Sequence, residues 1–190
     1  ADICRHRRGL VGGADGAGDE ARVVGRGDGV AGLAGDLGAG KTQLVRGMAR
    51  GLAAIKPGNT FGDIGHAIQK YVEAQRCSVV RDFCGHGVGK VFHDSPNVLH
   101  FGRPGEGPVL KEGMFFTVEP MVNAGTWQVK VLSDGWTAVT KDKQLSAQFE
   151  HSVGITETGV EFFTLSPKEL AKPPYDLGAA TAKTPATATA

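Results

Sequence analysis

Residues 114–119 read Met-Phe-Phe-Thr-Val-Glu. Aromatic and β-branched side chains dominate this run, and such side chains favour the pleated backbone of a β-strand. Similar runs predict further strands at residues 78–81, 149–155 and 160–164. A sheet-rich region is therefore expected around residues 114–119.

Two short turn sequences indicate how some of these strands pair. Asp134-Gly135 separates the expected strands 129–132 and 137–139, and this dipeptide tolerates the positive φ of a tight hairpin turn. Thr158-Gly159 joins the last two strands in the same way. Hairpins pair strands antiparallel, so the sequence predicts an α+β domain dominated by antiparallel strands.

A helix is expected immediately before the strand at residues 78–81. Thr60 is followed three residues later by Asp63, which resembles a capping box at a helix start. Apolar residues then recur with helical spacing until about Gln75. They are Ile64, Ala67, Ile68 and Val72.

A phosphate-loop motif precedes this region. Residues 35–42 read GDLGAGKT and satisfy G-x-x-x-x-G-K-[ST], after a weak strand expected at residues 30–34. From Lys41 apolar residues recur at helical spacing, so a helix is expected in spite of Gly47 and Gly51. The backbone amides of such a loop can hold phosphates, while the lysine reaches the terminal phosphates and the threonine binds magnesium. The candidate nucleotide-binding residues are Gly35, Gly38, Gly40, Lys41 and Thr42.

Residues 28–52 resemble the opening of the small ATPase that assists threonylcarbamoyladenosine modification of tRNA. A working nucleotide site also needs a strand-end carboxylate and a residue that positions water, and no such residues are identified here. The favoured interpretation is therefore a truncated loop with weak or no nucleotide binding. ATP with magnesium is kept only as a secondary cofactor hypothesis.

Three further motifs contain residues typical of metal sites. Residues 84–89 read CGHGVG and are followed by Phe92-His93, residues 117–121 read TVEPM, and residues 146–151 read SAQFEH. In this order and at these separations, the motifs resemble those of the type I methionine aminopeptidases. The resemblance extends over about residues 55–165.

The resemblance implies a partial pita-bread fold, as in creatinase and the aminopeptidases, and a set of site residues. His86, Glu119 and Glu150 would be metal ligands, His93 would contact the substrate amide, and Glu119 would also handle the proton of the attacking water. Carboxylates and imidazole suit Mn, Fe, Co or Zn, and a carboxylate can bridge two such ions. The glycines around His86 would let the backbone approach a ligand closely.

The sequence departs from the family before Ile55. Complete members resemble a two-fold pseudo-symmetric fold whose amino-terminal half supplies two aspartate ligands and another histidine. Here the aspartates before Ile55 mostly lie in glycine-rich or phosphate-loop sequence, so none is expected to be a ligand. A second ion would keep only Glu150. His66, His100 and His151 are expected to be ordinary surface or core residues.

The 190 residues divide by composition into segments. Residues 1–27 are glycine-rich and expected to be loose, residues 28–54 form the phosphate-loop fragment, and residues 55–165 the aminopeptidase-like domain. Residues 166–190, rich in proline, alanine and threonine, are expected to form a disordered tail. A net charge of +1 favours neither nucleic acid nor an acidic membrane as partner. No apolar run follows the first basic residues, so a cytoplasmic protein is expected.

The leading functional hypothesis is metal-dependent removal of methionine from the amino terminus of peptides and nascent proteins. The expected partner is thus a chain end that begins with methionine. Two alternatives remain open: an ATP-binding accessory protein of tRNA threonylcarbamoyladenosine modification, and a non-catalytic chimeric fragment.

Overall fold

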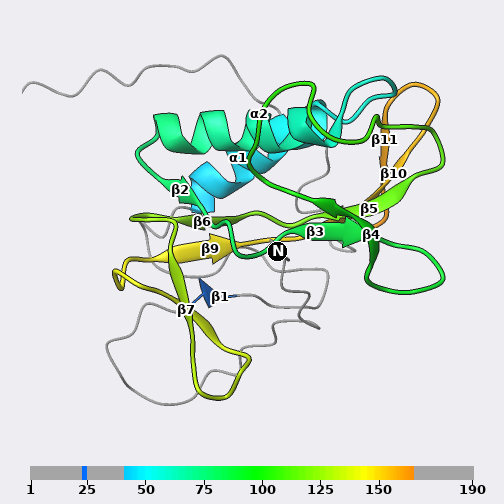
Figure 1. Ribbon diagram of the computed structural model, residues 1–190. Helices are drawn as coiled ribbons and strands as arrows, with labels where there is room; N and C mark the ends of the chain where they lie inside the picture. Colours follow the sequence, from blue (N-terminus) through cyan, green and yellow to red (C-terminus); the bar gives the residue numbers. More distant parts are fainter. Residues whose placement is uncertain (1–22, 25–40, 165–190) are drawn as a thin grey trace, which may run out of the picture.

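The computed structural model describes residues 23–24 and 41–164. Figure 1 shows its helices together on one face of a layer of strands. The expected strand at 30–34, the phosphate-loop glycines and the tail at 166–190 lie outside the described residues, as does most of the segment 1–27.

The helices are α1 (Lys41–Ala53) and α2 (Phe61–Ala74). The capping box predicted at the start of α2 is confirmed: Thr60 Oγ1 accepts the Asp63 N–H at 3.4 Å, and Asp63 Oδ2 accepts the Thr60 N–H at 2.7 Å. Within the described part of the chain, neither helix has the length and apolar character needed to cross a membrane.

Helices α1 and α2 cross closely because α1 carries glycines at the contact. A Cβ on Gly51 would lie 2.5 Å from Ile68 Cγ1, and one on Gly47 would lie 2.8 Å from Val72 Cγ2. The glycines that weaken the helical pattern of the sequence thus permit this approach. Helix α1 begins within the phosphate-loop motif, yet its apolar residues share one core with α2 and the strands. These residues are Leu44, Met48 and Leu52.

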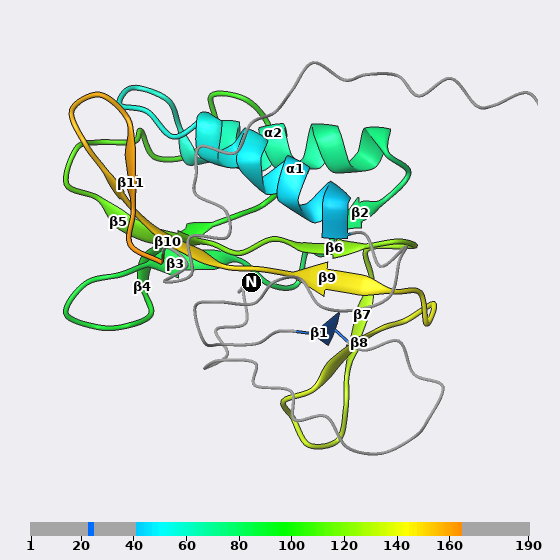
Figure 2. The ribbon, with the colours of Figure 1, turned by 180° about the vertical axis from the view of Figure 1, so that it is seen from behind.

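The strands form three sheets among the described residues, with the orders β11-β10-β5-β3-β4, β1-β9-β6-β2 and β7-β8 (Figure 2). Every pairing is antiparallel except that of β1 with β9. The strands are β1 (Val23–Val24), β2 (Ser78–Val79), β3 (Gly85–Gly87), β4 (Asp94–Val98), β5 (Phe115–Val118), β6 (Met121–Asn123), β7 (Val129–Val131), β8 (Ala138–Thr140), β9 (Ser146–Gln148), β10 (His151–Ile155) and β11 (Val160–Phe162).

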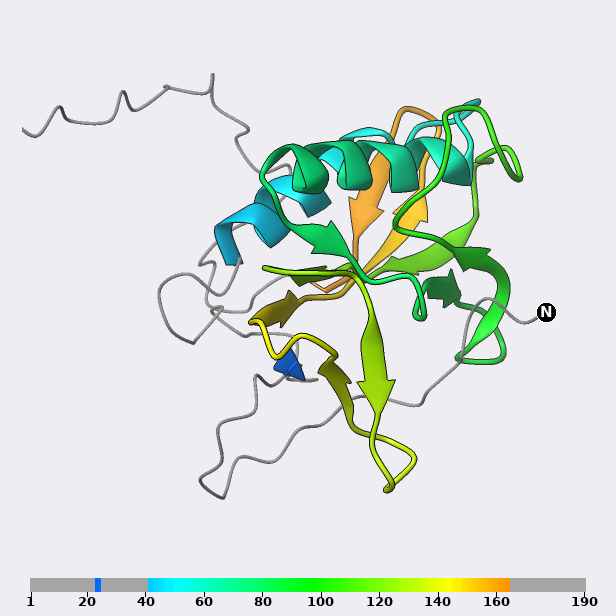
Figure 3. The ribbon, with the colours of Figure 1, turned by 60° about the vertical axis from the view of Figure 1, so that its left-hand side comes forward.

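Both predicted hairpins are confirmed. Strands β7 and β8 pair antiparallel, and Gly135 between them has a φ of +68°, as the expected turn requires. Strands β10 and β11 also pair antiparallel across the turn that contains Gly159. Figure 3 shows the β7-β8 hairpin extending from the sheet layer on the side away from the helices.

The predicted strands around the glutamates are interrupted. Strand β5 ends at Val118 and the chain continues as β6 in the neighbouring sheet, while β9 and β10 are separated in the same way. The strand expected at 149–155 therefore begins at His151. Val118 pairs with His151, and Met121 pairs with Gln148. Continuing this register across both interruptions places Glu119 opposite Glu150.

The core lies between the helices and one face of the sheets. Phe116 and Val118 of β5 are fully buried there, and the Phe116 ring meets Phe61 of α2 edge-on at 5.0 Å between centroids. Successive side chains of a strand point to opposite faces, so Thr117 and Glu119 lie on the face away from the helices. Strand β5 therefore contributes side chains to the core from one face and leads to the candidate site on the other.

The close helix crossing makes Gly51 sensitive to substitution. Gly51→Leu should raise helix propensity by roughly 1 kcal/mol. However, even its Cβ would collide with the buried Ile68, and overpacking typically costs about 1–3 kcal/mol. We expect a net loss of stability, seen as a lower urea midpoint. Arg46→Leu, an exposed position on the same helix, is the matched control and should change little. Equal midpoints for the two variants would contradict the close crossing.

Candidate metal centre

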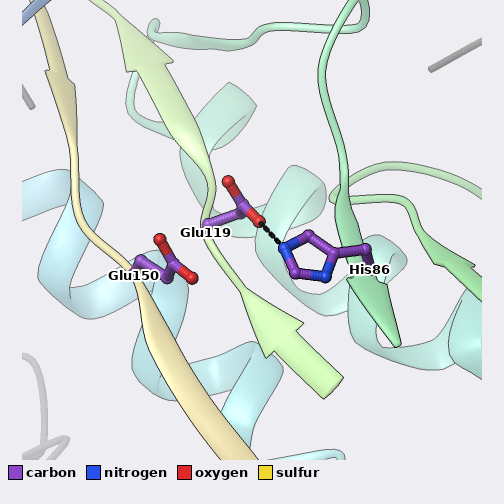
Figure 4. Close-up of side chains that lie close together, drawn as sticks. All are labelled: His86, Glu119 and Glu150. Carbon is purple, nitrogen blue, oxygen red and sulfur yellow. Dashed lines mark ion pairs between the residues drawn. The ribbon is translucent and has the colours of Figure 1, made fainter. Parts of the chain in front are cut away.

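Three side chains converge on the sheet face away from the helices. His86 lies on β3, Glu119 follows β5, and Glu150 precedes β10. Figure 4 shows the three side chains pointing toward one another. One ligand atom from each lies within 4.8 Å of the others. Among the described residues, this is the one group of three histidine, cysteine or acidic side chains whose ligand atoms lie this close together.

The hydrogen bonds of His86 leave one ring nitrogen available. Its Nδ1 lies 2.9 Å from the carbonyl oxygen of Gly87. Because a carbonyl oxygen only accepts, Nδ1 carries the proton and Nε2 keeps a lone pair in the neutral ring. Nε2 is the atom that faces Glu119, 3.8 Å from its Oε1. The same arrangement is common for histidines that bind metals.

Glu119 is held from two sides. Its backbone N–H donates to His100 Nε2 at 3.0 Å, and its Oε1 accepts the hydroxyl of Thr117 at 2.7 Å. Burial lowers the pKa of His100 to about 3, so the imidazole stays neutral and can accept. The sequence suggested no role for His100. Its 19-residue separation from Glu119 follows no motif and becomes meaningful only in the folded sheet.

The two carboxylates raise the electrostatic cost of the site. Burial, and then the neighbouring Glu150, raise the pKa of Glu119 to about 8, although the Thr117 hydrogen bond opposes this shift. Burial also raises the pKa of Glu150, against the opposing effect of His86. Two partly buried carboxylates with oxygens within 4.8 Å of each other are unfavourable without a cation. An imidazole nitrogen with two carboxylates is a donor set that suits a divalent transition metal, so these residues fit such an ion.

The glycines that flank His86 bring the strands together. A Cβ on Gly85 would collide with the carbonyl oxygen of Thr117, and a Cβ on Gly87 would collide with that of Ser95. The sequence predicts that these glycines let the backbone approach a ligand, whereas the close approach seen in the structure is to the neighbouring strands β5 and β4. It places His86 directly beside the strand that leads to Glu119.

His93 lies beside this group without belonging to it. Its half-buried ring is 4.3 Å from the His86 ring between centroids, and the exposed Phe92 ring is 5.3 Å from His86. The other histidines have different surroundings: His151 Nδ1 contacts Thr164 Oγ1 at 2.9 Å, and His66 Nδ1 contacts a backbone carbonyl at 3.4 Å.

Of the five expected nucleotide-binding residues, the structure describes only the backbone of Lys41 and Thr42. Gly35, Gly38 and Gly40 lie outside the described residues. Lys41 and Thr42 form the start of α1, but the positions of their side chains are not described.

Comparison with known sequences places this site in a family. The chain matches metallopeptidase family M24 over residues 42–157. It is 59% identical over 130 residues to the methionine aminopeptidase of Rickettsia prowazekii, covering 67% of this chain and 50% of that protein. It is 58% identical over 115 residues to methionine aminopeptidase A of Synechocystis sp., covering 60% of this chain and 46% of the relative. The chain thus spans about half the length of these relatives.

Solved structures agree with the sequence relatives. The crystal structure of the Rickettsia prowazekii methionine aminopeptidase has a TM-score of 0.65 at 53% identity, covering 69% of this chain and 55% of that chain. For the Thermotoga maritima enzyme the TM-score is 0.65 at 44% identity, with coverages of 68% and 53%. The antiparallel α+β fold is accordingly the partial pita-bread fold expected from the motifs. Because the family match includes more than half of the residues, the chain belongs to metallopeptidase family M24.

Proposed function

We propose that this chain removes methionine from the amino terminus of peptides and nascent proteins in a metal-dependent reaction. The convergence of His86, Glu119 and Glu150 is the observation that carries the proposal. The methionine aminopeptidases among the relatives support the choice of substrate. A cytoplasmic setting, expected from the sequence, fits a protein that meets newly made chains.

The proposed reaction assigns a role to each side chain. His86 Nε2 and the carboxylates of Glu119 and Glu150 would hold a divalent ion. Such an ion, when bound, lowers the pKa of a water molecule and so supplies a nucleophile at neutral pH. Glu119, whose Oε1 accepts the Thr117 hydroxyl, would also take up the proton of the attacking water. His93, beside His86, would hydrogen-bond the amide that is cleaved.

The number of donors limits how much metal the site can hold. Three protein ligands are what a catalytic ion commonly uses while keeping one position open. Within the described residues, a second ion would share Glu150 and gain no carboxylate of its own. We therefore propose one weakly held ion and slow turnover.

Metal content tests the ligand assignment. The purified chain should keep at most one divalent ion after mild dialysis, as measured by elemental analysis. His86→Ala should lose it, with a larger drop in affinity than the roughly 10- to 100-fold that outer partners of a ligand contribute. His66→Ala, on α2, is the matched control and should retain the ion. Equal metal content in both variants would show that His86 is not a ligand of the ion.

Peptide cleavage tests the activity. Methionine should be released from a Met-Ala-Ser peptide slowly, over hours, and Glu119→Gln should abolish this release because the proton acceptor is lost. Mass spectrometry of the products gives the rate, and the Glu119→Gln protein purified in parallel reveals any contaminating peptidase. Two tightly held ions with turnover in the usual enzyme range, on the order of 1–1000 per second, would contradict a one-ion site.

The phosphate loop is proposed to bind ATP weakly if at all. Helix α1 begins at Lys41, as a phosphate loop requires. However, the sequence identifies no strand-end carboxylate for the magnesium ion and no residue that positions water. Calorimetric titration with magnesium ATP should therefore show no saturation below millimolar concentrations. Micromolar binding that Lys41→Ala abolishes would instead favour the ATP-binding alternative.

A further inference from the structure

Thr117 is a fully buried residue whose hydroxyl contacts two of the proposed ligands. Its Oγ1 lies 3.0 Å from the backbone nitrogen of His86 and 2.7 Å from Oε1 of Glu119. One hydroxyl thus connects the main chain of β3 with the carboxylate that follows β5. The metal-binding motifs contain this threonine, but the ligand assignment leaves it without a role.

The direction of both hydrogen bonds is determined by chemistry. A backbone N–H can only donate, so the hydroxyl oxygen accepts from His86 and its single proton goes to Glu119 Oε1. That same Oε1 lies 3.8 Å from His86 Nε2. Thr117 and the Glu119 carboxylate therefore link the backbone of His86 to the Nε2 side of its own ring.

The surroundings restrict where the hydroxyl of Thr117 can lie. On one side β3 packs so closely that a Cβ on Gly85 would collide with the Thr117 carbonyl and lie 3.0 Å from its Oγ1. On the other side Thr117 pairs with Ser152 of β10. A β-branched side chain has few χ1 rotamers, so the packed strands and the side chain together leave the hydroxyl few orientations.

We propose that Thr117 is a positioning residue, which holds the Glu119 carboxylate and His86 in the relative position that lets them share one divalent ion. This inference rests on the proposed function, because it requires His86, Glu119 and Glu150 to be ligands. Outer partners of this kind orient ligands that would otherwise rotate away, and their loss typically weakens metal binding by about 10- to 100-fold.

Titration of the full chain with Co²⁺, followed by calorimetry and by the visible absorption of the ion, tests the inference. Thr117→Val should bind Co²⁺ about 10- to 100-fold more weakly and change the absorption spectrum. Thr117→Ser restores the hydroxyl and should recover both. Thr140→Val is the matched control: Thr140 is also buried and donates to the Gln144 carbonyl at 2.7 Å, but in the β7-β8 hairpin. It should leave the affinity unchanged.

Three results would overturn the proposal. Affinity of Thr117→Val within about threefold of the parent would show that the hydroxyl does not position the ligands. A loss shared by Thr117→Ser would point to packing alone. A parent chain that takes up no Co²⁺ would remove the proposed metal site itself, and this inference with it. If Thr117→Val fails to fold, Thr117→Ala removes the same hydroxyl without adding a methyl group and is read in the same way.

Discussion

Two pairs of antiparallel strands share one register, and this register places two carboxylates opposite each other. The pairings of Val118 with His151 and of Met121 with Gln148 bracket Glu119 and Glu150. Like charges facing each other across a strand pair are unfavourable, and burial makes them more so. Burial and then the neighbouring Glu150 raise the pKa of Glu119, and burial raises the pKa of Glu150. The remaining features of the site either keep the two carboxylates opposite each other or lower the electrostatic cost of that arrangement.

The helix layer maintains this arrangement from the opposite face. Phe116 and Val118 anchor β5 in the core, so the intervening Thr117 and the following Glu119 are directed to the other face. Glycines provide close approach at two different contacts. On α1 they let the helices cross, and around His86 they let β3 lie against β5. A bulkier residue on α1 would separate the two helices, and one beside His86 would push β3 away from its neighbouring strands.

Much of the site was accessible from the sequence because its chemistry is concentrated in short motifs. The ordered motifs resemble those of the type I methionine aminopeptidases, and that resemblance implies His86, Glu119 and Glu150 as ligands; the structure brings these three side chains together. The capping box and the hairpin turns are local signals in the sequence. The interruptions after Val118 and before His151 were missed, because residues 149–155 read as one continuous strand.

Other elements depend on tertiary contacts that no local pattern records. Strands β3, β4, β6 and β9 were not predicted, because each is short and two of them contain residues that are rare in strands, namely the glycines of β3 and Pro96 of β4. His100 is a core residue, one of the two alternatives expected for it, but its hydrogen bond was not predicted, since its partner is the backbone of Glu119 in another segment. Helix propensity also disfavours the glycines of α1, because it takes no account of the close contact with α2 that they allow.

The separation of the converging residues along the chain has a thermodynamic consequence. His86, Glu119 and Glu150 come from distant segments and meet only after β3, β5 and β10 have paired. An unfolded chain offers no comparable site, so any ion held there would stabilise the native state by mass action. Local opening of the sheet at the paired interruptions would in turn release the ion. Occupancy of the site is thereby linked to the integrity of the whole sheet.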